Sequence, residues 1–150
     1  MSIIINKPRS LFTEKTKEKL VLSICLICIF LLLSTAYSKI IGYHGFSDGL
    51  SIVPVIGNYA KYIALLVPTA EITIASLLII PKTYKWGLYG FTILMTLFTG
   101  YIVSMLLWAE KMPCHCGGAI EKLSWTQHVW FNLGFIALAT FALWLSKNKS

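Results

Sequence analysis

Residues 86–108 read WGLYGFTILMTLFTGYIVSMLLW and contain no charged side chain. Because a helix rises about 1.5 Å per residue, a stretch of this length crosses the roughly 30 Å hydrocarbon layer of a bilayer. Three further apolar blocks lie at 20–40, 62–80 and 125–145. None of them shows the alternation with a period of two that a barrel strand needs. The sequence therefore predicts an all-α integral membrane protein whose four transmembrane helices form a bundle.

The composition of the 150 residues agrees with this fold class. Apolar side chains make up 57% of the chain and charged ones 13%, whereas soluble chains have about 45–50% and about 25%. Four cysteines are too few for a secreted disulfide scaffold. The block at 20–40 is longer than the apolar core of a signal peptide, so we interpret it as a retained span.

Basic residues divide unevenly among the segments between the spans. Nine of the thirteen lie in the N-terminal arm, the turn between the second and third spans and the C-terminal tail. The positive-inside rule then predicts that both termini are cytoplasmic. The expected organisation is a basic cytoplasmic arm 1–19, a four-helix membrane domain 20–146 and a cytoplasmic tail 147–150, in the inner membrane of a bacterium. The net charge of +7 then reflects orientation beside anionic lipid, and no nucleic acid partner is expected.

The loop between the first and second spans, residues 42–61, is long and not very polar. We expect it to pack as a loop over the mouth of the bundle, with a position along the outer membrane interface as the alternative.

The loop before the fourth span carries the most specific motif, Cys114-His115-Cys116-Gly117-Gly118. On the outer side of a bacterial membrane, this pair would lie in an oxidising compartment. A protonated histidine beside a thiol favours the reactive thiolate. A disulfide between residues two apart closes a strained ring, and strained, exposed disulfides are the exchangeable ones. The motif therefore favours thiol–disulfide exchange through Cys114 and Cys116.

Two other interpretations of this motif stay open. Copper or zinc could be held by Cys114, His115 and Cys116, with His128 as a fourth ligand, although the usual two-residue spacing between cysteines is missing. Alternatively, the cysteines have no chemical role. A bridge to Cys25 or Cys28 is not expected, because those residues lie early in the first span, on the other side of the bilayer.

The start of the fourth span is marked by Ser124-Trp125-Thr126-Gln127, which has the spacing of a capping box. His128 then lies in the first turn, within plausible reach of the cysteine loop. We interpret it as a proton partner of the thiols. The alternative is an interfacial histidine among the tryptophans of the membrane boundary.

An acidic residue, Glu71, lies near the middle of the second span. A charge there costs several kcal/mol, so such residues usually face the bundle interior and serve a function. Glu71 is expected either to form a proton or quinone site or to hold helices together. Its candidate partners are Lys39 in the first span and four polar residues of the third span, Thr96, Thr99, Tyr101 and Ser104. Cys25 and Cys28 are interpreted as small packing residues.

The chain resembles the MauE/DoxX-like membrane proteins from residue 20 to residue 145. The resemblance is carried by Tyr37-Ser38-Lys39, Pro68-x-x-Glu71, Gly100-Tyr101 and Cys114-x-Cys116-Gly117. It implies a four-helix bundle related in layout to disulfide-relay membrane proteins. It also implies the maturation of a disulfide-rich periplasmic dehydrogenase subunit in methylamine utilisation, together with a thioredoxin-like partner.

Two functional hypotheses follow. In the first, Cys114 and Cys116 exchange disulfides with a periplasmic thioredoxin-like or cysteine-rich partner, while His115, Glu71 and His128 assist and quinone is a candidate cofactor between the helices. The chain would then be a component of a thiol–disulfide oxidoreductase. In the second, it is a non-catalytic subunit of a membrane assembly or a copper- or zinc-handling accessory.

Overall fold

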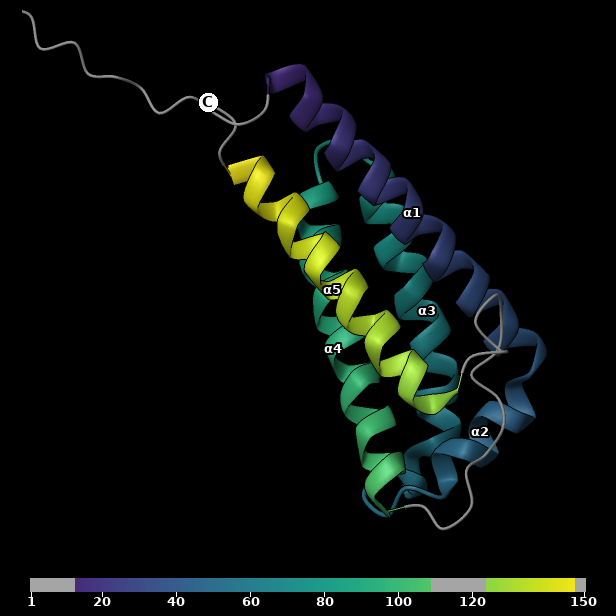
Figure 1. Cartoon of the computed structure of the whole chain (residues 1–150). Helices are drawn as coiled ribbons and strands as arrows, with labels where there is room; N and C mark the ends of the chain where they lie inside the picture. Colours follow the sequence, from purple (N-terminus) through teal and green to yellow (C-terminus); the bar gives the residue numbers. More distant parts are fainter. Residues whose placement is uncertain (1–12, 109–123, 148–150) are drawn as a thin grey trace, which may run out of the picture.

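The computed structural model describes residues 13–108 and 124–147. The described chain is helical, with α1 at Glu14–Ile41, α2 at Tyr43–Ser51, a 3-10 turn η1 at Gly57–Tyr59, α3 at Ala60–Ile79, α4 at Tyr84–Trp108 and α5 at Trp125–Lys147 (Figure 1). Among these, α1, α3 with the η1 turn, α4 and α5 are long and apolar enough to cross a membrane. The expectation of an all-helical chain with four spanning helices is confirmed for these residues.

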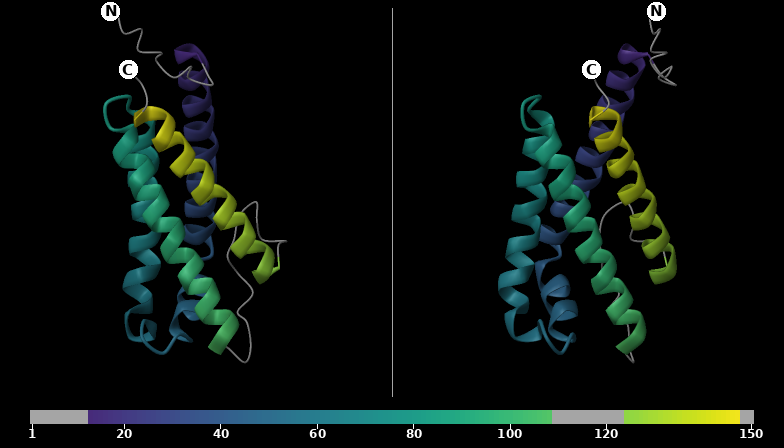
Figure 2. Two further views of the ribbon diagram at one scale, coloured as in Figure 1. Left: turned by 60° about the vertical axis from the view of Figure 1, so that its left-hand side comes forward. Right: turned by 90° about the vertical axis from the view of Figure 1, so that its left-hand side faces the viewer.

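The four long helices form a closed ring in which each packs mainly against two neighbours, with a smaller contact between α1 and α4. Chain neighbours α1 and α3, α3 and α4, and α4 and α5 pack together, and α5 returns to α1. Figure 2 shows that successive helices run in opposite directions, so the beginning of α1 and the end of α5 lie at one end of the bundle. The short helix α2 lies at the opposite end (Figure 1). We name these the terminal end and the α2 end.

Helix α1 begins six residues before the predicted span. The side chain of Thr13 accepts a hydrogen bond from the backbone N–H of Thr16 at 3.4 Å, and Glu14 occupies the first turn. Both features stabilise a helix start, because they supply an acceptor and a negative charge to free backbone N–H groups. The helix therefore includes three of the five basic residues of the predicted arm, Lys15, Lys17 and Lys19.

The outer surface of the bundle is apolar. Phe30 on α1 and Trp130 on α5 are 70% and 71% exposed, and Leu65 on α3 and Leu107 on α4 are similarly exposed. A soluble monomer rarely exposes contiguous apolar surface of this extent. These side chains are therefore positioned to contact lipid chains.

Small residues allow the helices to approach closely. Ala64 and Ala75 on α3 and Ala139 on α5 are buried. A methyl group added at Gly87 on α4 would lie 2.9 Å from the backbone nitrogen of Leu78 on α3. This is the pattern by which membrane helices associate, since lipid offers no hydrophobic driving force between them.

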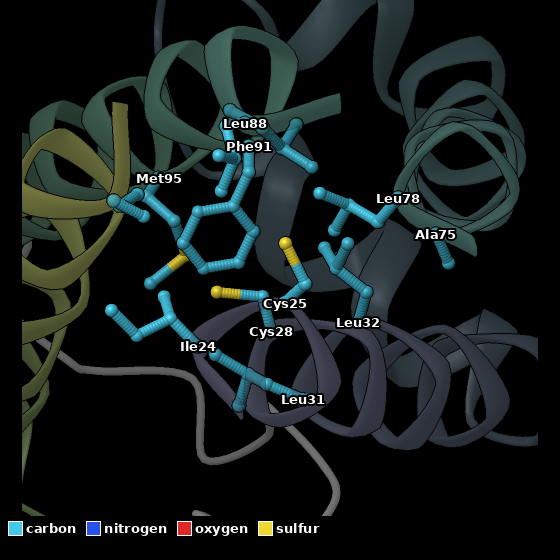
Figure 3. Close-up of a cluster of buried hydrophobic side chains, with 13 residues drawn as sticks. Ile24, Cys25, Cys28, Leu31, Leu32, Ala75, Leu78, Leu88, Phe91 and Met95 are labelled. Carbon is cyan, nitrogen blue, oxygen red and sulfur yellow. The ribbon is translucent and has the colours of Figure 1, made fainter. Parts of the chain in front are cut away.

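The apolar core lies between α1, α3, α4 and α5 and contains both cysteines of the first span. Cys25 and Cys28 are buried free thiols, and Figure 3 shows them pointing from α1 toward Phe91. They pack in one cluster with Leu32 and Leu88. This agrees with the interpretation of the two cysteines as packing residues.

The segment after α1 is more ordered than the predicted loop. Instead of a loop at 42–61, the chain forms α2 and η1. Leu50 is buried, and it packs with Phe46 against Ala60 and Ala64 of α3. The apolar residues of this segment explain the difference, because a helix buries them while its backbone hydrogen bonds stay satisfied. The segment does cover the bundle at the α2 end.

Candidate functional site

The site is built around a buried ion pair between α1 and α3. Lys39 Nζ donates to Glu71 Oε1 at 2.7 Å. Glu71 is fully buried and Lys39 is 7% exposed. Removing two charges from water costs several kcal/mol for each ion, so a pair of this kind adds little net stability. Ionisable residues within membrane spans are candidates for a functional role. Among the candidate partners of Glu71 that the sequence offered, the structure selects Lys39.

Thr35 completes the contact. It lies one turn before Lys39 on the same face of α1, and its hydroxyl lies 3.0 Å from Glu71 Oε1. The same hydroxyl is 3.0 Å from the carbonyl oxygen of Leu31 and 3.1 Å from that of Leu32. Because a hydroxyl has one hydrogen, it can donate to the carboxylate or to its own helix. Thr35 can therefore release its bond to Glu71 without losing a partner.

Aromatic rings surround the lysine ammonium group. Lys39 Nζ lies 4.9 Å from the ring centroid of Phe98 on α4 and 5.7 Å from that of Phe46 on α2. Each ring face attracts the cation by roughly 0.5–2 kcal/mol, with the larger values where water is excluded. The ammonium group, which α1 carries, thus contacts residues of α2, α3 and α4.

A pocket of about 60 Å³ adjoins the ion pair. The pair enters from α1 and α3, while His128 and Asn132 enter from α5 and Tyr101 from α4. Its other lining residues are apolar or already described: Leu31, Leu32, Thr35, Phe46, Met95, Phe98, Ile102 and Phe131. Side chains from all four long helices and from α2 therefore meet at one place.

The capping box of α5 positions His128. The backbone N–H of Ser124 donates to Gln127 Oε1 at 2.9 Å, and the backbone N–H of Gln127 donates to Ser124 Oγ at 3.3 Å. This confirms the predicted start of the helix. His128 Nδ1 lies 3.0 Å from the carbonyl oxygen of Ser124. Because a carbonyl oxygen only accepts, Nδ1 carries a hydrogen and the other ring nitrogen, Nε2, is directed elsewhere.

Two polar atoms of the site have no partner within the described chain. They are Glu71 Oε2 and His128 Nε2, and both are buried. His128 is 5% exposed, so the expected alternative of a histidine among the lipid headgroups is wrong. An unpaired buried polar atom costs about 1–3 kcal/mol, so both atoms are expected to have a partner outside the described residues.

The predicted site residues divide into two groups. The structure brings Glu71 and His128 together at one pocket, whereas Cys114, His115 and Cys116 lie outside the described residues. These three residues are also the first three ligands of the alternative metal site, of which only His128 is described. Within residues 13–108 and 124–147, no three histidine, cysteine or acidic side chains are grouped to hold a metal ion.

The polar candidates on α4 have different roles. The hydroxyls of Thr96, Thr99 and Ser104 donate to carbonyl oxygens four residues earlier in their own helix, at 2.8 Å in each case. The expectation that these three residues are candidate partners of Glu71 is therefore wrong. Tyr101 lines the pocket.

Sequence reasoning missed Thr35 and Asn132. Both lie one turn from a residue that it did select, since Thr35 precedes Lys39 by four residues and Asn132 follows His128 by four. Residues four apart share a face of a helix. The four-residue spacing from Lys39 and His128 could therefore have predicted that Thr35 and Asn132 belong to the site.

A second, larger pocket lies at the terminal end of the bundle. It has a volume of about 300 Å³ and is lined by Lys17, Glu18, Val21, Leu22, Cys25, Leu78, Ile79, Pro81, Tyr84, Leu145 and Ser146. A pocket that binds benzene has about 150 Å³. By size, the pocket beside Glu71 therefore does not accommodate a quinone ring, whereas the larger pocket does.

Of three comparisons with known proteins, one gives a match. No curated protein and no solved structure matches the chain significantly. The family model for methylamine utilisation protein MauE matches residues 17–145. These include the four spanning helices, apart from the first three residues of α1 and the last two of α5, and the pocket beside Glu71. The match covers most of the chain, and the protein belongs to the MauE family.

Proposed function

We propose that this protein is a multi-pass bacterial inner-membrane protein that exchanges disulfides with a periplasmic thioredoxin-like or cysteine-rich partner. Membership of the MauE family supports a role in maturation for methylamine utilisation. We infer that both termini are cytoplasmic and that the α2 end faces the periplasm. The distribution of basic residues supports this orientation.

The observation that carries the proposal is the convergence of Glu71, Lys39 and His128 on one pocket. His128 lies in the first turn of α5, twelve residues after Cys116 in the sequence. With Nδ1 bonded to a carbonyl oxygen, neutral His128 presents Nε2 as a base. A buried ion pair with an adjoining base is an arrangement typical of proton handling within membranes.

The chemistry of the proposed exchange is balanced between the two proteins. A thiolate attacks a sulfur of the partner disulfide and forms a mixed disulfide, and the second thiolate then releases the partner. One disulfide is formed and one is reduced, so two electrons and two protons pass between the proteins. His115 favours the thiolate form. His128 and Glu71 hold the proton between the release of one thiol and the formation of the other. Quinone is not a participant in these steps.

Alkylation of thiols after acid quenching tests the proposal. Cys25 and Cys28 are free and should react only after denaturation, so the chain should carry two labels when the Cys114–Cys116 pair is oxidised and four when it is reduced. We expect both forms in cells, with the ratio changing when an oxidised or a reduced thioredoxin-like protein is added to spheroplasts. The double variant Cys114→Ser/Cys116→Ser is the control and should always carry two labels.

The proposal fails if the pair never changes its redox state and the double variant supports full maturation of the partner. A result of that kind, together with a stable membrane complex, would favour a non-catalytic subunit. Stoichiometric copper or zinc that is lost in Cys114→Ser would favour the metal-handling alternative.

A further inference from the structure

The two unpartnered atoms of the site belong to residues that line the same pocket. Glu71 Oε2 and His128 Nε2 are both buried without a partner among the described residues. The carboxylate oxygen accepts hydrogen bonds, and so does Nε2 of a neutral imidazole whose Nδ1 carries the hydrogen. Two acceptors cannot satisfy each other. A ligand in the pocket that donates more than one hydrogen bond would satisfy both.

The volume of the pocket limits what this ligand is. Its 60 Å³ is well below the roughly 150 Å³ of a pocket that binds benzene. It exceeds the roughly 10–15 Å³ that one water molecule needs. An organic cation of small size would fit less well, because the Lys39 ammonium group already occupies the other oxygen of Glu71 at 2.7 Å.

We propose that the pocket binds water that bridges Glu71 Oε2 and His128 Nε2. The inference does not depend on the thiol chemistry, because it concerns only described residues. A buried water molecule typically makes about three hydrogen bonds. Tyr101 and Asn132, which both have polar side chains, line the same pocket. Water also suits both protonation states of His128, since it can accept a hydrogen bond from the imidazolium as well as donate to the neutral ring.

The bridge joins two parts of the bundle that have no direct polar contact in the described structure. It extends the chain from Lys39 on α1 through Glu71 on α3 to His128 and the Ser124 carbonyl at the start of α5. A proton can pass from imidazolium to carboxylate along the water and return, so that neither atoms nor charge are lost. The charged and titratable groups that face this path are Lys39, Glu71, Tyr101 and His128.

Proton-detected NMR of the full chain in lipid nanodiscs tests the proposal. We expect a cross-peak between water and the Hε1 proton of His128 in the wild-type protein. Ile102→Phe enlarges a lining side chain and should remove the cross-peak by displacing the water. Ile93→Phe makes the same change on the exposed side of α4 and should keep it. If Ile102→Phe does not fold, Leu31→Phe fills the same pocket from α1.

The absence of the cross-peak from the wild-type protein would overturn the proposal. So would a cross-peak from lipid or quinone carbon-bound protons to His128 in place of water, or a water cross-peak that persists in a folded pocket-filling variant. These outcomes leave the proposed disulfide exchange standing, since that is measured by the redox state of Cys114 and Cys116.

Discussion

Replacing Lys39 by methionine removes the partner of a fully buried carboxylate while keeping a long, flexible side chain. Glu71 would then be charged and unpaired in a nonpolar environment, and breaking a buried pair in this way costs about 3–5 kcal/mol. Proton uptake limits the loss. Protonating a solvent-exposed glutamate side chain at pH 7 costs about 3.7 kcal/mol, because pH 7 lies about 2.7 units above its ordinary pKa of about 4.3 and each unit corresponds to about 1.36 kcal/mol. We therefore expect Lys39→Met to lose about 3–4 kcal/mol of unfolding free energy at pH 7.

The assay is reversible unfolding in mixed micelles, followed by the fluorescence of the five tryptophans. Because the folded variant binds the proton and the unfolded chain releases it, the loss should shrink by about 1.4 kcal/mol for each unit that the pH falls toward 5. The double variant Lys39→Met/Glu71→Gln leaves no buried charge and should recover most of the loss. Lys61→Met, at an exposed lysine of α3, should stay within about 0.5 kcal/mol of the wild type.

A loss below about 1 kcal/mol for Lys39→Met would refute the reasoning, because this is the range of exposed ion pairs. So would a double variant as unstable as the single one, since that would assign the loss to packing of the lysine stem rather than to the charge.

Three further outcomes are expected from the geometry. Gly87→Ala places a methyl group 2.9 Å from the backbone of α3 and should lower the unfolding free energy by about 1–3 kcal/mol in the same assay. The control Gly100→Ala, whose methyl group meets nothing within 4 Å, should not lower it. Equal effects of the two variants would contradict the close approach of α3 and α4. Ser124→Ala removes the acceptor for the backbone N–H of Gln127 at the start of α5. It should lower the unfolding free energy by about 1 kcal/mol in the same assay. An unchanged unfolding free energy would show that the cap is dispensable. In a Cys114→Ser/Cys116→Ser chain, a cysteine at position 61 should react with a membrane-impermeant maleimide in intact cells and one at position 82 should not. The reverse pattern would invert the proposed orientation.

The sequence was sufficient for the helices because hydropathy reports the solvent directly. In a bilayer every backbone hydrogen bond must be satisfied within the span, so a long apolar block such as 86–108 has few alternatives to a helix. The capping box at Ser124 and Gln127 was also readable, since its hydrogen bonds connect residues three apart. These features depend on local chemistry.

The site was harder to predict because it depends on contacts between distant residues. Glu71 was recognisable as a functional candidate from its depth alone, but five residues were equally plausible partners for it. The register of α1 against α3 selects Lys39 and adds Thr35, and hydropathy contains no information on that register. The helix α2 was missed for a related reason, because its apolar residues become a helical face only when α3 is there to cover them.

The ion pair also has a consequence for how the chain enters the membrane. Glu71 is the only acidic residue of α3, and an acidic side chain at the centre of a lone inserting helix costs about 2.5–3.5 kcal/mol. Lys39 precedes it in synthesis, so the first helix offers a countercharge before the second leaves the translocon. The two segments are thus expected to partition into lipid as a helical hairpin, and α3 synthesised without α1 should be retained less efficiently in the bilayer.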